Sequence, residues 1–364
     1  MINDQIRQLA TRPDSKGPFV TLYIDTARND EAQKDRIRLF LKNETGRLRE
    51  TIGENGNGLE EAIRQIERYV DDSLSPDTRG LAIFSAPDEH YFSPMQLPVP
   101  VRPQLAIGSR PHIRQLTELR QSHPAAALAM IDAKSARLFI VNFGVLEFEI
   151  DLENPDTPKR HDQGGWSQSN IQRHLQENID RHHQKAADAL ARIVDQGRAR
   201  GGVVLSGQER NVANFRSFLP KRVDEKVIGV LHLDMHSNVE DVTAACSALI
   251  RGRARGDVMA RASALEGSRA AVGLNRVVAA LNERKVDTLF VSTKASARGW
   301  RCLGCRIIGL EVPLGCPVCA EPVRSCDLVE AMILTAEADG TAVACIDEPS
   351  HLDRFEGVGA SLRF

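Results

Sequence analysis

Short apolar runs alternate with longer amphipathic stretches along most of this chain. In the first third, runs rich in β-branched and aromatic side chains predict buried strands at residues 18–25 and 80–85. Charged stretches with helically spaced apolar positions predict helices at residues 31–51 and 59–74, separated by a glycine-rich turn. Residues 1–123 are therefore expected to form an α+β domain.

The middle of the chain continues this alternation. Its apolar runs predict a meander of three strands, at residues 125–131, 136–143 and 145–150. Beyond a long amphipathic helix, further strands and helices are predicted to alternate at residues 202–207, 211–219, 227–233 and 239–265. Alternating strands and helices favour α/β packing, so residues 124–268 are expected to form a second domain. A helix at residues 273–281 and a strand at residues 286–291 predict a third, α/β domain over residues 269–364.

Four of the seven cysteines fall in this third domain as two closely spaced pairs, Cys302-x-x-Cys305 and Cys316-x-x-Cys319. Two such pairs are typical of four thiolates around a tetrahedral zinc ion. No histidine or carboxylate belongs to the pattern, which favours a structural zinc ribbon over a catalytic site. Cys326 is an alternative ligand, whereas Cys246 and Cys345 are expected to be small buried apolar residues.

A polar segment precedes the long helix of the middle domain. Residues 154–163 contain no side chain suited to a core, and Gly164 and Gly165 follow them. Adjacent glycines allow backbone angles closed to other residues and a close approach to another molecule. The segment is therefore predicted to be a loop.

Gln168 is predicted to stand at the working end of this loop. Ser169 and Gln172 have the spacing of a capping box, which places Gln168 just ahead of a helix N-terminus. Unpaired N–H groups and the positive end of the helix dipole suit an oxygen that gains negative charge. An amide cannot act as a nucleophile or strong base, but it can orient water and donate hydrogen bonds. This chemistry fits hydrolysis of an activated ester.

Basic side chains on the helix behind the loop are candidates for RNA contact. The candidates near one helical face, with Trp166 as a stacking residue, are Arg173, His174, Arg181 and Lys185. A solvated polar face is an equally good interpretation. His182 and His183 lack further ligands at metal spacing, and Asp132 lacks the partner acids of a metal-dependent ribonuclease.

Net charge and composition narrow the function classes. The formal charge of the 364-residue chain is −2, so the protein is not a general nucleic-acid-binding polycation and RNA contacts must be local. The start of the chain lacks a signal-peptide pattern, and no apolar run approaches the roughly 20 residues that span a bilayer. The cysteine spacing suits a reducing compartment. A cytoplasmic protein without a membrane partner is expected.

The segment Gly164-Gly165-x-x-Gln168, followed by a polar, basic helix, resembles the middle domain of the archaeal and eukaryotic class-I release-factor superfamily. In that superfamily a Gly-Gly-Gln loop enters the peptidyl transferase centre and triggers peptidyl-tRNA hydrolysis. Here Trp166 and Ser167 separate glycine from glutamine, a spacing similar to that of Vms-type peptidyl-tRNA hydrolases and their bacterial relatives.

The resemblance extends beyond the loop. The meander at residues 125–150 resembles the ribonuclease-H-like core of the release-factor middle domain. Residues 273–291 and 355–364 resemble its C-terminal domain, a fold shared with kink-turn-binding ribosomal proteins, on which a translational GTPase often docks. The resemblance therefore implies the ribosome and peptidyl-tRNA as partners. No stop-codon-reading motif occurs in residues 1–123, so codon recognition has no support.

Two functional interpretations follow from the resemblance. In the first, the protein is a peptidyl-tRNA hydrolase of translation termination or ribosome rescue, with Gly164 and Gly165 shaping the loop and Gln168 positioning water. In the second, it is a non-catalytic hibernation or rescue factor that binds the ribosome and resembles Pelota or Balon. The altered spacing of the glutamine keeps this second interpretation open.

Overall fold

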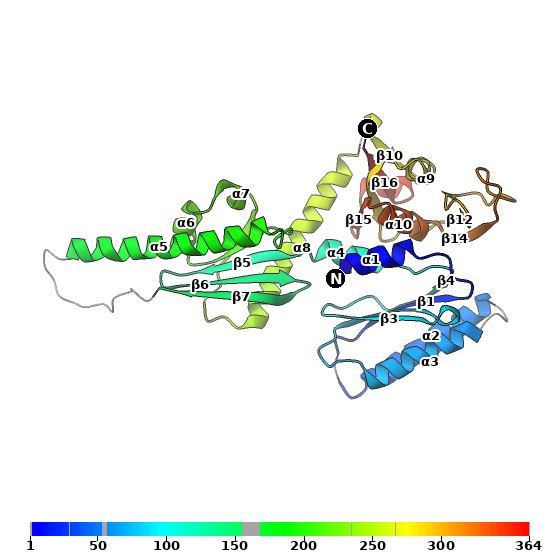
Figure 1. Ribbon diagram of the computed structural model, residues 1–364, viewed down its shortest axis with the longest axis horizontal. Helices are drawn as coiled ribbons and strands as arrows, with labels where there is room; N and C mark the ends of the chain where they lie inside the picture. Colours follow the sequence, from blue (N-terminus) through cyan, green and yellow to red (C-terminus); the bar gives the residue numbers. More distant parts are fainter. Residues whose placement is uncertain are drawn as a thin grey trace. The chain divides into compact units, whose positions relative to one another are not determined.

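The computed structural model describes residues 2–28, 30–52, 57–154, 168–233, 235–265 and 267–363. The chain forms two compact units: Met1–Gln121 with Asp257–Phe364, and Ser122–Gly256. Helices and strands mix in both units, so the predicted multidomain fold of mixed α/β type is confirmed (Figure 1). The finer division into domains of residues 1–123, 124–268 and 269–364 stays a prediction. Among the described residues, no helix has both the length and the apolar character needed to cross a bilayer.

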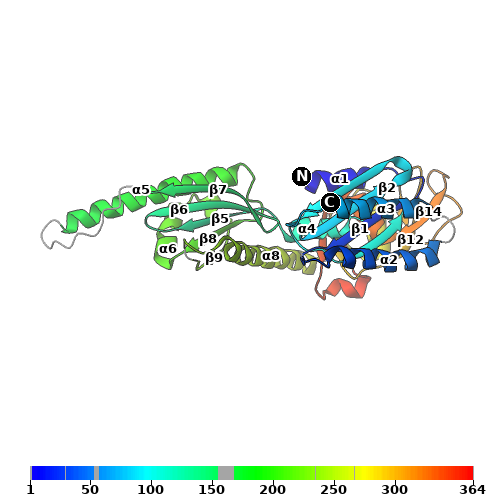
Figure 2. The ribbon, with the colours of Figure 1, turned by 90° about the horizontal axis from the view of Figure 1, so that it is seen from below.

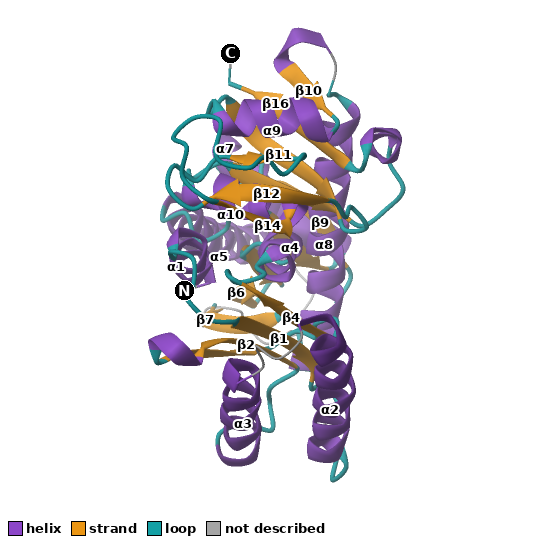
Figure 3. Cartoon of the chain, turned by 90° about the vertical axis from the view of Figure 1, so that its right-hand side faces the viewer, coloured by secondary structure: helices purple, strands orange, loops and turns teal. Residues whose placement is uncertain are grey.

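An antiparallel sheet of order β3-β2-β1-β4 forms the N-terminal part of the first unit. Its strands are β1 (Phe19–Asp25), β2 (Gly80–Ala86), β3 (Tyr91–Leu97) and β4 (Gln104–Gly108). The helices of this part are α1 (Ile2–Thr11), α2 (Gln33–Ile52), α3 (Asn57–Asp72) and α4 (Arg114–Ser122). Figure 3 shows α2 and α3 on the same face of the sheet. That arrangement matches the helices predicted at residues 31–51 and 59–74.

Alternate residues of β1 point to opposite faces of this sheet, and side chains on both faces are buried. Val20, Leu22 and Ile24 pack against α2 and α3. Phe19 and Tyr23 belong to a second core, which also contains side chains of α1, α4 and the helices at residues 274–282 and 328–338. The N-terminal and C-terminal parts of the chain therefore share one hydrophobic core, which makes them a single compact unit.

The C-terminal part of the first unit contains two sheets. The larger has the order β10-β16-β11-β15, with strands at Ala270–Val272, Val358–Leu362, Val286–Ser292 and Ala342–Ile346. The smaller has the order β13-β12-β14, with strands at Ile308–Gly309, Arg298–Cys302 and Val323–Asp327. Two helices, α9 (Leu274–Asn282) and α10 (Leu328–Ala338), complete it. The helix and strand predicted at residues 273–291 are present as α9 and β11.

The second unit is built on a five-stranded sheet of order β7-β6-β5-β8-β9. Its strands are β5 (Ala126–Ile131), β6 (Ser135–Asn142), β7 (Val145–Glu153), β8 (Val203–Gly207) and β9 (Val227–Leu231). The first three form the predicted antiparallel meander, and β8 and β9 extend it in parallel. Its helices are α5 (Gln168–Asp195), α6 (Glu209–Ser217), α7 (Lys221–Asp224) and the first part of α8 (Val239–Ser263). Side chains of α5 and α6 pack on one face, and Val242, Cys246 and Ile250 of α8 pack on the other.

Candidate functional sites

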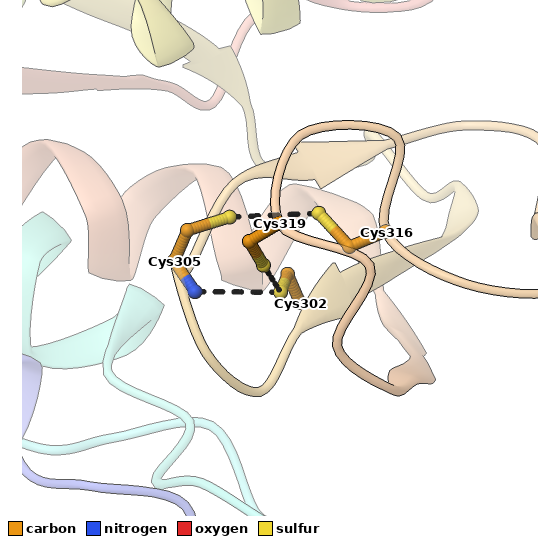
Figure 4. Close-up of side chains that lie close together, drawn as sticks. All are labelled: Cys302, Cys305, Cys316 and Cys319. Atoms are coloured by element: carbon orange, nitrogen blue, oxygen red, sulfur yellow. Dashed lines mark hydrogen bonds between the residues drawn. The ribbon is translucent and has the colours of Figure 1, made fainter.

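The four paired cysteines come together at the end of the small sheet (Figure 4). Cys302 ends β12, Cys305 lies in the turn after it, and Cys316 and Cys319 lie in the turn before β14. All four Sγ atoms lie within 4.8 Å of one another. The Sγ atoms of Cys302 and Cys319 are 3.3 Å apart, and those of Cys305 and Cys316 are 3.5 Å apart.

The backbone around these thiols is arranged to stabilise negative charge on sulfur. The N–H groups of Gly304 and Cys305 donate to Cys302 Sγ at 3.3 and 3.4 Å, and that of Val318 donates to Cys316 Sγ at 3.4 Å. Burial opposes ionisation of Cys302, but these bonds and the contact with Cys319 lower its pKa to about 6, whereas burial and the neighbouring thiols raise the pKa of Cys305 to about 12. Stabilised thiolates are what a metal ion requires from cysteine ligands.

The two Cys-x-x-Cys turns share a backbone feature that the spacing of the cysteines alone did not predict. Arg306 follows the first Cys-x-x-Cys pair and Ala320 follows the second, and both adopt left-handed backbone angles, with φ of 68° and 61°. Left-handed residues turn the chain sharply, which returns each loop to its sheet. The four cysteines therefore form a cluster that could hold a metal ion.

The other cysteines lie outside this cluster. Cys326, the alternative ligand, lies on β14 and is absent from the group of thiols that come together among the described residues. Cys246 and Cys345 are buried within hydrophobic cores, as predicted. The alternative in which Cys326 replaces one ligand has no support in the geometry.

Of the residues predicted to form the catalytic loop, Gln168 is among those that the structure describes. Gly164, Gly165 and Trp166 lie outside the described residues. Gln168 begins α5, whereas the capping box predicted that the helix would begin after Ser169. The difference is within the uncertainty of one or two residues that attends any helix end. The catalytic roles of these residues stay predictions.

The first half of α5 projects beyond the sheet of the second unit (Figures 1 and 2). No side chain of residues 173–181 is buried, whereas burial begins at His182 and continues through the second half of the helix. We call residues 168–181 the arm of α5. A helix that stands clear of its own core is available for contact with another molecule.

The predicted RNA-contact residues of α5 are all exposed, namely Arg173, His174, Arg181 and Lys185. His174 Nδ1 lies 3.4 Å from the carboxylate of Glu177. Within the parts of the chain that the structure describes, Arg173, Arg181 and Lys185 form no ion pair. Three cations on one helix thus keep their charge available for an external anion. Their role in RNA binding stays a prediction.

His182 and His183 attach α5 to the sheet of the second unit. Both are buried, and the ring of His183 meets the rings of Phe215 and Phe218 edge-on. His183 Nε2 lies 3.4 Å from the carbonyl oxygen of Asp132, and His183 Nδ1 lies 3.3 Å from Asn214 Nδ2. Burial lowers the pKa of both histidines. Neutral, packed imidazoles act here as structural anchors.

Asp132 likewise has a structural environment. It lies in the turn between β5 and β6, where its N–H donates to Ser135 O at 2.9 Å. Its carboxylate accepts a hydrogen bond of 2.9 Å from Asn211. These contacts fit the expectation of a turn aspartate.

With this geometry established, comparison with known proteins identifies the superfamily. The model of bacterial archaeo-eukaryotic release factor family 10 matches residues 111–251. The predicted relationship to the release-factor superfamily is confirmed. The match spans the described meander, α5, β8, β9 and the first half of α8. It does not distinguish the predicted Vms-like branch from others.

Similar proteins occur in bacteria. The Mycobacterium tuberculosis protein Rv2629 is 25% identical over 379 residues, covering 100% of this chain and 97% of that protein. YocB of Bacillus subtilis is 21% identical over 199 residues, covering 51% of this chain and 76% of its own length.

Solved structures of archaeal translation factors are similar at a low level. Archaeal translation termination factor aRF1 is 16% identical over 100% of this chain and 98% of that chain, with a TM-score of 0.29. Archaeal Pelota, in a model of its ribosome-bound form with ABCE1, is 13% identical over 100% and 94%, with a TM-score of 0.44. At such scores the likeness carries no weight for function.

Proposed function

We propose that this protein acts on the ribosome in termination or rescue of translation, by hydrolysing the ester bond of peptidyl-tRNA. The match of residues 111–251 to a release-factor family carries this proposal, because it covers both the Gly-Gly-x-x-Gln segment and the helix behind it. The exposed arm of α5 supports it, because a long polar arm suits a segment that must reach into a narrow site.

In this proposal the loop supplies the chemistry. Gly164 and Gly165 would let the backbone approach the ester closely, since they carry no Cβ. Gln168 would orient a water molecule towards the ester carbonyl and donate a hydrogen bond to the oxyanion that forms. Its position at the start of α5 supports this role, because the first N–H groups of a helix and its dipole favour negative charge.

Exposed cations of α5 would position the substrate. Arg173, Arg181 and Lys185 are exposed cations on the helix that follows Gln168, and a tRNA acceptor stem presents phosphates that such cations bind without reading sequence. Trp166 would stack on a base or hold the loop in place. Because the net charge of the chain is −2, we expect this contact to be local and of modest affinity.

The remaining parts would connect the protein to its partners. The ion at the cysteine cluster is proposed to be structural Zn²⁺, because four thiolates provide the soft, tetrahedral ligand set that zinc prefers. The middle part is proposed to have a ribonuclease-H-like core, and residues 269–364 the fold of kink-turn-binding ribosomal proteins. A translational GTPase is the proposed partner of that last region, by its resemblance to release-factor C-terminal domains.

One observation favours a second candidate function. Two residues separate Gly165 from Gln168, whereas the release-factor loop has glycine and glutamine adjacent. A loop of altered length places its amide differently, so a ribosome-binding factor without hydrolase activity, resembling Pelota or Balon, is the alternative.

Peptide release from ribosome-bound, labelled peptidyl-tRNA tests the proposal. Wild-type protein is expected to release peptide, and Gln168→Ala is expected to slow release by roughly 10²-fold, as for other lost preorganised donors. Gln176→Ala is the matched control, because Gln176 is exposed on the same arm and its amide donates a hydrogen bond of 2.7 Å to Asp180. Equal release by all three proteins would refute the catalytic role of Gln168.

A further inference from the structure

A cavity of about 210 Å³ lies inside the first unit, where the end of β4 and the turn after it meet β14 and α10. This is far more than the roughly 10–15 Å³ that one water molecule needs. Its apolar wall consists of Ile107, Pro111, Ala331 and Leu334. Three arginines from separate segments also line it, Arg110, Arg301 and Arg324.

The carboxylate of Asp14 is engaged by one of these arginines. It forms an ion pair with Arg301, whose side chain is almost fully buried, and accepts a hydrogen bond of 3.0 Å from Ser109 Oγ. Asp14 therefore offsets the charge of Arg301 and has little capacity left for the other two guanidinium groups.

Two further carboxyl groups at the cavity face other partners. Asp327 accepts from the N–H of Glu330 at 3.0 Å, as the cap of α10. Glu330 accepts from the N–H groups of Ile113 and Arg114 at the start of α4. The Arg114 guanidinium lies 3.9 Å from each carboxyl group. Burial raises the pKa of Glu330 and outweighs these contacts, which act in the opposite direction. Neither group is arranged to neutralise the arginines across the cavity.

Arg110 and Arg324 are left without a carboxylate partner. Arg110 donates to the carbonyl of Ala10, and its Nε is buried without any hydrogen bond. Arg324 donates only a weak bond of 3.5 Å, to the carbonyl of Ser15. No ion pair joins either side chain to an acid in the described ranges. Burial, reinforced by the charge of Arg301, lowers the pKa of Arg110 to about 10. Asp14 acts in the opposite direction, but no described carboxylate forms an ion pair with this guanidinium.

We propose that this cavity binds the phosphate group of a small organic phosphate. Arg110 and Arg324 both line the cavity and supply planar, permanently charged donors, which match phosphate oxygens in pairs. A phosphate ester carries roughly −1.5 to −2 at neutral pH and so neutralises both arginines, whereas a carboxylate neutralises one. The apolar wall receives the organic part of the ligand.

Isothermal titration of the full chain at low ionic strength tests this site. Adenosine monophosphate and inorganic pyrophosphate are the probes, and uncharged adenosine is the control ligand. We expect saturable binding of adenosine monophosphate at one site per chain and none of adenosine. Arg110→Gln and Arg324→Gln should each weaken binding at least about tenfold, the usual order for one lost charge-assisted contact. Arg276→Gln should leave it unchanged, because Arg276 is an exposed arginine on α9 outside the cavity.

Three results would overturn the proposal. These are no saturable binding of either phosphate probe, adenosine binding as tightly as its monophosphate, or equal weakening by Arg276→Gln. Arg324 is exposed, so Arg324→Gln should keep the fold. If Arg110→Gln lowers stability, the binding measured with Arg324→Gln alone tests the proposed phosphate site. Peptide release does not enter this test, so its outcome is separate from that of the proposed hydrolase activity.

Discussion

The cysteine cluster and the arm of α5 are opposite kinds of site. In the cluster, four thiols lie within 4.8 Å and backbone N–H groups already point at sulfur, so the chain itself fixes the geometry. On the arm, residues 173–181 bury no side chain, and Arg173 and Arg181 have no ion-pair partner among the described residues. The cluster is organised by local sequence. The arm, in our account, acquires its working geometry from the molecule that it binds.

Loss of the metal ligands should produce the largest effect. Cys302→Ser is expected to abolish metal binding and unfold the small sheet, because structural zinc supplies on the order of 10 kcal/mol to such a site. Zinc content per chain and thermal unfolding would measure this. Cys326→Ser is the matched control and should retain the metal, since Cys326 lies outside the cluster. Equal zinc loss from both variants would contradict the assigned ligand set.

Two leucines of α5 allow the arm to be compared with the anchored half of the same helix. Leu190 is fully buried, so Leu190→Ala should cost about 2–5 kcal/mol of unfolding free energy. Leu175 lies on the arm and is only half-buried, so Leu175→Ala should cost much less. Urea unfolding of both variants measures the difference. Similar costs would show that the arm is packed against the protein after all.

The anchoring histidines predict a pH dependence of the second unit. Burial lowers the pKa of His182 and His183, so the folded state holds both neutral while the unfolded chain takes up protons below about pH 6.5. Stability should therefore be complete above that pH and fall as the pH drops from it towards the lowered folded-state values.

Urea unfolding between about pH 5 and 8, the range over which histidine titrates, measures that loss. The double variant His182→Gln, His183→Gln should show a flatter pH profile than the wild type. The groups facing these rings are Asp132, Asp180 and Lys185, and their contribution is common to both proteins. An unchanged slope in the variant would assign the pH dependence to other residues.

The smallest expected effects concern the exposed cations of α5. Arg181→Gln and Lys185→Gln should each weaken binding to an acceptor-stem RNA and reduce the salt dependence of that binding by about one ion. Arg276→Gln should change neither quantity, because Arg276 lies in the first unit. Binding measured by anisotropy over a series of salt concentrations would decide. An unchanged salt dependence of RNA binding in both variants would favour a solvated helix face without an RNA contact.

Local patterns explain what the sequence could predict. The strands β5 to β9 and the helix α5 follow their apolar periodicity to within a few residues, and the paired cysteines follow their spacing. Helix α10 was not predicted, because it is buried on nearly all sides and its apolar residues show no amphipathic period. The shared core of the N-terminal and C-terminal parts was also missed, since it depends on contacts between distant segments.

The cavity arginines illustrate the same limit. Arg110 is separated from Arg301 and Arg324 by the entire second unit in sequence, and only folding brings them together. No spacing rule connects such residues. For the arm the difficulty is different, because its exposed cations have the same sequence pattern whether they bind RNA or water.

The most direct test of our account measures ribosome binding and peptide release in the same reactions. For the wild type we predict release that is proportional to the bound protein. For Gln168→Ala we predict equal binding with release slower by roughly 10²-fold. Full ribosome binding without release by the wild type would contradict the hydrolase proposal and favour a factor that only occupies the ribosome.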